Sequence, residues 1–350
     1  MTDPGTADPV LPALPDVLLF LAAAATIGFA ATRLARDADR LADRTGLGEA
    51  LTGTMLLGLI TALPGLAASV AAAWAGHPAL AIGNALGGIA FQTMILAFAD
   101  IAHRDANLEH AAASLENMMQ TLMLVLLMTL VLIGLSSPDV TLGPVHPVTG
   151  LLLLAAPLAF GLVYGVREQP MWWPRQTAQT VEDRPDPASR EGSLLRLIAS
   201  FVTMATLALV AGVVLARAAA EIAAETGLSE AVMGGLFMAV ATSLPELVTS
   251  LAAVRRGALT LAVANIVGGN FFDVLFVAAA DFAFLGGSIY HGAGVGRREI
   301  FIVALTILLN VVLLAGLLRR QRHGPGNIGL ESVGMLVIYA AGFLVLGFAL

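Results

Sequence analysis

The sequence contains no cysteine and no lysine, and only 12% of its 350 residues are charged. The absence of cysteine excludes disulfide bonds and thiolate metal sites. A soluble domain typically has about 25% charged residues, so this chain has too little charge to cover a water-exposed surface. No basic patch interleaved with aromatic residues indicates nucleic-acid binding. The sequence contains no nucleotide-binding, metal-chelating or intramembrane Ser/His motif that would indicate an enzyme.

Long apolar runs are abundant, and 58% of the residues are hydrophobic. A run of about 20 apolar residues is long enough to cross a bilayer. The sequence therefore predicts an all-α polytopic membrane protein of the cell membrane with ten transmembrane helices. The expected spans are 16–34, 47–73, 79–101, 110–135, 147–166, 194–220, 228–254, 259–284, 297–318 and 328–350.

All 18 basic residues are arginine, and their positions predict the orientation. Arginine accumulates in cytoplasmic loops. If the N-terminus lies outside, 15 of the 18 fall in cytoplasmic loops and only Arg217, Arg297 and Arg298 fall outside. Both termini are therefore expected outside, and the proline-rich segment 167–193 is expected to be a cytoplasmic linker. The bias toward Ala, Gly and Arg is typical of a GC-rich bacterial genome.

An internal repeat is the strongest pattern in the chain. Residues 45–100 align without a gap with residues 226–281 at an offset of 181, with 23 identities in 56 positions. The matched residues include prolines, asparagines, glycine pairs and a terminal aspartate, which composition alone would not keep in register. The offset corresponds to five spans, so the second copy would be inserted upside down. We expect two inverted five-helix halves, 1–166 and 194–350.

Each repeat contains a proline within a span, in Thr61-Ala62-Leu63-Pro64 and in Thr242-Ser243-Leu244-Pro245-Glu246. A proline removes one backbone donor and displaces the carbonyl four residues earlier. A free carbonyl at bilayer depth requires a polar cavity or an ion. The hydroxyl groups of Thr61, Thr242 and Ser243 add oxygen ligands of the kind that hard cations prefer. A plain structural kink is the alternative interpretation of both prolines.

Two acids, Glu246 and Asp273, fall inside predicted spans, where a carboxylate is costly and usually functional. The amides of Asn84, Asn265 and Asn270 fall near the middles of spans, where they could be either cation ligands or links between helices. The repeat-matched pair Asp100 and Asp281 falls at span ends, so we expect both at the membrane interface.

The segments Ala241–Ser250 and Ala264–Asp273 resemble the second α-repeat of the sodium/calcium exchanger family, part of the calcium/cation antiporter superfamily. The resemblance implies two inverted five-span halves, no cofactor, and inorganic cations and membrane lipid as the partners. It also implies the ion ligands of the second half, which are Glu246, Asp273, Thr242, Ser243, Asn265 and Asn270. In the first half, Thr61 and Asn84 match the motif, and Gln92 occupies the position equivalent to Asp273.

The first repeat departs from the family motif at two positions. Gly65 stands where the family has glutamate, and Ile89 stands where it has asparagine. Because calcium affinity depends on the number of charged ligands, the first change predicts weaker Ca²⁺ binding or fewer coupled ions. Gly65 would alternatively leave room for water or for an acid from another span.

Three functions fit these patterns. The first is an antiporter that exchanges Ca²⁺ or Na⁺ against Na⁺ or H⁺ by alternating access. The second is a monovalent cation/proton exchanger with one acid fewer. The third is a non-transporting relative that binds ions or a partner on the same scaffold.

Overall fold

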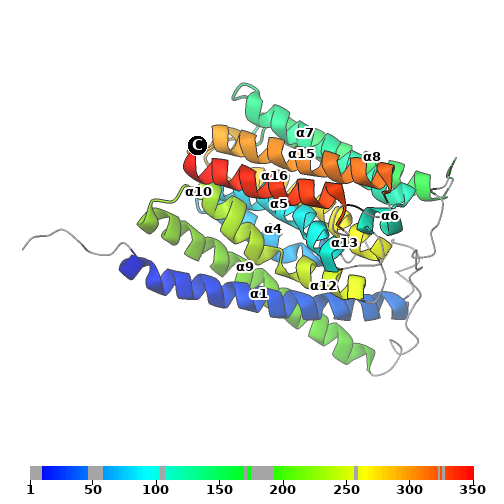
Figure 1. The fold of residues 1–350 in the computed structure, drawn as a ribbon. Coiled ribbons are helices and arrows are strands. Elements are labelled where there is room, and N and C mark those ends of the chain that lie inside the picture. Colours follow the sequence, from blue (N-terminus) through cyan, green and yellow to red (C-terminus); the bar gives the residue numbers. More distant parts are fainter. Residues whose placement is uncertain are drawn as a thin grey trace, which may run out of the picture.

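The computed structural model describes residues 10–45, 58–102, 107–168, 170, 172, 174, 193–255, 259–321, 324 and 328–350. Helices dominate these residues (Figure 1). In chain order they are α1 (Val10–Thr45), α4 (Leu63–Trp74), α5 (Pro78–Ala102), α6 (Leu108–Ala112), α7 (Leu115–Ser136), α8 (Pro147–Glu168), α9 (Leu194–Thr226), α10 (Glu230–Val232), the π-helical η2 (Met233–Met238), α11 (Ala239–Thr242), α12 (Leu244–Arg255), α13 (Leu259–Asp273), α14 (Leu275–Ala283), the short 3₁₀ helix η3 (Ile289–His291), α15 (Arg297–Arg319) and α16 (Leu330–Phe348).

Within the described residues, eight helical stretches are long and apolar enough to cross a membrane, and the bent pair 230–242 and 244–255 makes a ninth. The chain is thus a multi-pass helical membrane protein. The one expected span not found among these nine is 47–73. Its first part falls on residues 46–57, which lie outside the described part of the chain. The count of ten spans and the two inverted halves therefore remain predictions. The N-terminal segment 1–9 and most of the linker 167–193 also lie outside the described residues.

The predicted span 110–135 differs from the structure because its start is interrupted. Helix α6 ends at Ala112, and α7 begins at Leu115 after two residues in extended conformation. The Ser114 side chain accepts a hydrogen bond from the Asn117 backbone N–H and so caps the new helix. Serine is a strong N-cap residue, and here it starts a second helix where hydrophobicity alone predicts one continuous span.

Helices α5 and α13 lie at the centre of the bundle. The spans Pro78–Ala102 and Leu259–Ala283 contain α5 and α13. In each of them, 83% of an apolar 18-residue stretch is buried inside the protein, against 17% for α9. Figure 1 shows α1 and α9 side by side along one edge of the molecule, with α7, α15 and α16 on the opposite side of α5. The contrast in burial indicates that α9 is directed toward lipid, whereas α5 and α13 hold the interior.

Glycines allow the central helices to cross at very short range. A Cβ atom added to Gly87 on α5 would lie only 2.1 Å from the carbonyl oxygen of Gly235 on η2. Gly234 approaches the Leu80 carbonyl oxygen in the same way, at 2.4 Å. Only residues without a side chain permit such backbone contact. The first glycine of the matched pair therefore serves helix packing, which is the plain interpretation of this motif.

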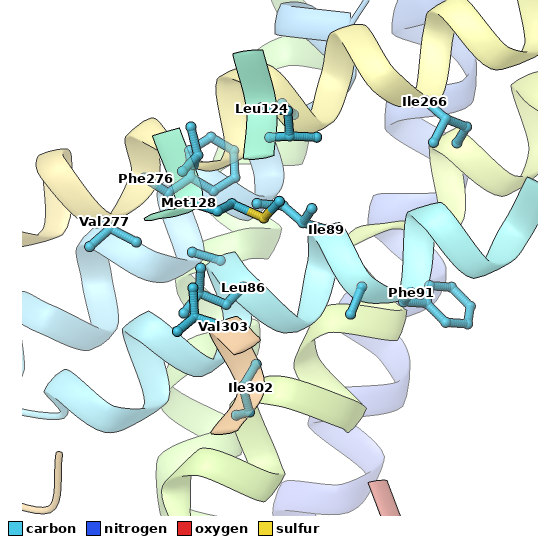
Figure 2. Packing of buried hydrophobic residues seen from close by; sticks show 14 of the residues in the cluster. Leu86, Ile89, Phe91, Leu124, Met128, Ile266, Phe276, Val277, Ile302 and Val303 are labelled. Carbon is cyan, nitrogen blue, oxygen red and sulfur yellow. The ribbon is translucent and has the colours of Figure 1, made fainter. Parts of the chain in front are cut away.

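Apolar side chains fill the other faces of the central helices. Figure 2 shows Leu86 and Ile89 of α5 among side chains of α7, α14 and α15, with Met128 close to Ile89. Ile89 is fully buried. The departure from the family motif at this position therefore extends the hydrophobic core, and it contributes no oxygen atom to a site.

Candidate functional site

Both helix breaks expected from the sequence are present. In the second half, α11 ends at Thr242, Ser243 forms a turn, and α12 starts at Leu244 with a bend of 46°. In the first half, a turn at Ala62 precedes α4. Pro64 and Pro245 each occupy the second position of the new helix, where a backbone N–H has no partner within the helix anyway. Each proline therefore starts a helix next to a short unwound point.

A small cavity lies between these two breaks and the central helices. The volume open to the centre of a water molecule is about 10 Å³. This is about the room that one water molecule or one small cation requires. Its lining consists of Ala62, Gly65, Asn84, Gly88, Gln92, Thr242, Ser243, Glu246, Asp273 and Phe276. Six of the nine predicted ligands are among these residues.

The two predicted acids meet in this cavity. Glu246 is 1% exposed and Asp273 is 3% exposed, and both line the cavity. Among the described residues, Glu246 Oε2, Asp273 Oδ1 and Gln92 Oε1 are buried without a hydrogen-bond partner. None of the described residues that line the cavity is basic. Buried acceptors without donors are costly, and a cation is the ligand that would satisfy all three.

Gln92 and Asp273 also reveal how the two repeats meet. The Gln92 Nε2 group donates to Asp273 Oδ2 at 2.6 Å and to Ser243 Oγ at 3.2 Å. Gln92 and Asp273 are separated by 181 positions, which is the offset of the sequence repeat. Equivalent residues of two copies related by a twofold axis can touch only close to that axis. The hydrogen bond is therefore consistent with a cavity at the junction of the repeats, where inverted-repeat transporters bind their ions.

Thr61 and Thr242 support the cavity from the two breaks. Thr61 is a hydrogen-bond partner of the Glu246 side chain, so it contacts the site through that acid without lining the cavity. Thr242 Oγ1 lines the cavity and donates to Asn84 Oδ1 at 3.1 Å. Each threonine thus connects its own break to a polar side chain of the other half.

The repeat-matched asparagines have the same helix-linking role but different access to the cavity. Asn84 Nδ2 donates to Ser69 Oγ at 2.8 Å, and Asn265 Nδ2 donates to Ser250 Oγ at 3.3 Å. Ser69 and Ser250 are themselves separated by 181 residues. Asn84 also lines the cavity, whereas Asn265 does not. In this conformation Asn265 links α12 to α13.

Asn270 also lies outside the cavity lining. Its Nδ2 group donates to Thr93 Oγ1 at 3.2 Å, and Thr93 in turn lies 3.4 Å from Asn310 Oδ1. Asn270 thus belongs to a second buried polar cluster between α5, α13 and α15, completed by Thr306, which donates to the Leu86 carbonyl at 3.2 Å. Thr93, Thr306 and Asn310 are not among the site residues predicted from the sequence. The spacing of Thr306 and Asn310, one helical turn apart within an apolar span, is the signal that could have identified them.

Gly65 lines the cavity, which has room for about one water molecule, but the position where a side chain at Gly65 would begin is occupied. A Cβ atom at Gly65 would lie 2.9 Å from Cε2 of Phe276. The Phe276 ring, 5% exposed, therefore occupies the space where a side chain at position 65 would begin. Phe276 is not among the site residues predicted from the sequence, although it follows Asp273 by about one helical turn on the same face.

Asp100 and Asp281 lie near helix ends as expected, and both are fully buried. Asp100 accepts hydrogen bonds from the backbone N–H groups of residues 108 and 329, at 2.6 and 2.8 Å. Asp281 accepts from the backbone N–H groups of residues 289 and 146, at 2.8 and 2.9 Å, and from the Thr149 hydroxyl at 2.6 Å. Each aspartate therefore fixes the loops at one end of the bundle. Their burial was not predicted, because position along a span does not reveal burial by loops.

Comparison with known proteins agrees with this geometry. The family model described as sodium/calcium exchanger protein matches residues 16–163 and 196–348. CaxA of Alkalimonas amylolytica is 26% identical over 303 residues, covering 86% of this chain and 90% of the relative. The inner membrane protein YrbG of Escherichia coli is 34% identical over 118 residues, which are 34% of this chain and 33% of YrbG.

Two solved structures have a similar fold. The H⁺/Ca²⁺ exchanger CAX superposes with a TM-score of 0.67 at 13% identity, covering 94% of this chain and 82% of CAX. The sodium-calcium exchanger NCX_Mj superposes with a TM-score of 0.60 at 17% identity, covering 95% of this chain and 98% of NCX_Mj. At these identities the likeness establishes the fold alone.

Proposed function

Because the chain belongs to the sodium/calcium exchanger protein family, we propose that it is a secondary active antiporter whose cations bind between Glu246 and Asp273. It exchanges Ca²⁺ or Na⁺ against Na⁺ or H⁺ by alternating access. The observation that carries this proposal is the set of three buried oxygens without hydrogen-bond partners, on Glu246, Asp273 and Gln92, around one cavity. Two carboxylates without a basic neighbour in that lining attract small cations.

The position of the cavity supports alternating access. Its lining combines Asn84 and Gln92 from α5 with Thr242, Ser243 and Glu246 from the second break. A site between two repeats can be opened to either side of the membrane when the repeats rock against each other. The size of the cavity supports one small cation at a time in this conformation.

Ion flux in proteoliposomes tests the proposal. A panel of outward gradients of Na⁺, K⁺ and H⁺ is combined with Ca²⁺-, Na⁺- and pH-sensitive dyes. Glu246→Gln should lower cation flux at least about tenfold, equivalent to about 1.4 kcal/mol. Glu225→Gln is the matched control, because Glu225 is exposed at the end of α9. Parental flux in Glu246→Gln would contradict the assigned site, and ion binding without any flux would identify a non-transporting protein.

A monovalent cation/proton exchanger is the second candidate. The specific observation in its favour is that the first half supplies only neutral side chains to the cavity, including Gln92 opposite Asp273. A site with two carboxylates has less charge to offset the cost of dehydrating a divalent cation. Na⁺ or K⁺ flux coupled to H⁺, with no Ca²⁺ movement at any gradient, would select this candidate.

A further inference from the structure

A second, larger hollow lies between α1 and α9. Figure 1 shows these two helices at the edge of the bundle. It has a volume of about 450 Å³ and shares no lining residue with the central cavity. Its lining consists of Gly28, Phe29, Thr32, Arg33, Arg36, Ser200 and Met204. We name it the α1–α9 groove.

One end of the α1–α9 groove is basic. Arg33 and Arg36 both line it, and both side chains are exposed. Asp37 is buried beside them and accepts a hydrogen bond from the Ser200 hydroxyl, so part of its charge is already used within the protein. Arg33 approaches Asp37 through Nε at 3.7 Å, and the Arg33 side chain is still 49% exposed. Its guanidinium group is therefore accessible to an anion in the groove.

The other end of the groove is apolar. Phe29 is 66% exposed, and Met204 of α9 lies on the facing wall. The groove thus combines two cationic side chains with an apolar surface, which matches a molecule that has an anionic head and a hydrocarbon chain.

The depth of the two arginines matches the headgroup layer of a bilayer. The apolar run of α1 begins after Asp16, and Arg36 follows Asp16 by 20 residues. At 1.5 Å per residue this distance is about 30 Å, the thickness of the hydrocarbon core. Arg33 and Arg36 therefore lie where the opposite leaflet presents its phosphate groups, on the side where the arginines of the chain accumulate.

We propose that the α1–α9 groove binds an anionic phospholipid of the membrane, with its phosphate held by Arg33 and Arg36 and an acyl chain along Phe29. Basic pockets between transmembrane helices on the cytoplasmic side recognise such headgroups. Free phosphate shares the headgroup chemistry, but it would leave the apolar half of the groove unused.

The groove also lies close to the ion site across α1. A Cβ atom at Gly28 would be 3.6 Å from Cδ1 of Leu244, the first residue of α12 at the second helix break. A lipid in the groove therefore packs against the same helix that covers the break.

Lipid titration of the purified full-length protein tests the proposal without relying on transport. Binding of phosphatidylglycerol, phosphatidylcholine and inorganic phosphate is measured in neutral detergent by native mass spectrometry. Each arginine near a headgroup contributes about 1 kcal/mol, which is about fivefold in Kd. Arg33→Gln and Arg36→Gln should each weaken phosphatidylglycerol binding about fivefold, and together about 25-fold. Arg36→Lys should retain binding because it retains the charge.

Arg255→Gln is the matched control, because Arg255 is an exposed arginine at the end of α12 and outside the groove. It should leave the Kd unchanged. Equal affinity for phosphatidylcholine, an unchanged Kd in the double variant, or displacement of the lipid by equimolar inorganic phosphate would overturn the proposal. These results would not bear on the cation site, whose test is flux.

Discussion

The contact between Gly65 and Phe276 predicts how the protein could gain calcium selectivity. Gly65→Glu introduces the acid that the first helix break lacks. A Cβ atom there would lie 2.9, 3.7 and 3.8 Å from Cε2, Cζ and Cδ2 of the Phe276 ring. We therefore expect Gly65→Glu alone to gain no Ca²⁺ transport, because its carboxylate is deflected from the cavity. Gly65→Glu combined with Phe276→Ala should gain it.

The magnitudes follow from packing and charge. Overpacking of this kind costs about 1–3 kcal/mol, and Phe276→Ala alone costs about 3–5 kcal/mol through the cavity it leaves. In the double variant the two defects offset each other, so the coupling should be at least about 1 kcal/mol. A carboxylate 4 Å from the ion contributes about 4 kcal/mol per unit of ion charge at an effective dielectric constant of about 20. Before dehydration costs, Ca²⁺ therefore gains about twice as much as Na⁺.

Thermal unfolding in detergent measures the coupling, and Ca²⁺ uptake against Na⁺ and H⁺ gradients measures the selectivity. Gly65→Glu with Phe272→Ala is the control, because Phe272 is partly buried one turn away and does not line the cavity. The reasoning fails if Gly65→Glu alone is as stable as the parent and transports Ca²⁺ as well as the double variant.

Two further predictions concern packing and loop anchoring. Gly87→Ala should destabilise the protein by more than about 3 kcal/mol, because its Cβ atom would overlap backbone that cannot move aside. Gly88→Ala should fold normally, since its nearest neighbours lie at 3.8 Å or more; equal losses in thermal unfolding would refute the difference. Asp281→Asn should cost at least the roughly 1.5–3 kcal/mol of one charged hydrogen bond. Asp139→Asn, at an exposed loop position, should cost nothing, and similar unfolding temperatures for the two variants would argue against the anchoring role.

The two repeats share helix-forming and helix-linking residues but contribute different side chains to the cavity. Proline, asparagine and serine are retained at equivalent positions in both halves, where they begin helices and link them. The carboxylates that line the cavity, Glu246 and Asp273, come only from the second half. The first half instead places Gly65 against Phe276 and buries Ile89 in the core, so loss of charge there is accompanied by apolar filling.

The sequence alone determined the membrane class, most of the spans and the two acids of the site. These features are readable because hydrophobic length, the register of a repeat and a carboxylate inside an apolar run are properties of consecutive residues. The family also follows from consecutive residues, since the motif of the second repeat is local.

Only the tertiary structure decided which polar side chains share one cavity. Asn265 and Asn270 fit the motif as well as Asn84 does, yet they bond to neighbouring helices, and Phe276 fills the space beside Gly65. The rotation of each helix about its axis decides these outcomes, and contacts between residues far apart in the chain set that rotation. No local sequence pattern records these contacts. The sequence therefore predicted both the residues that line the cavity and the residues that link helices as ion ligands.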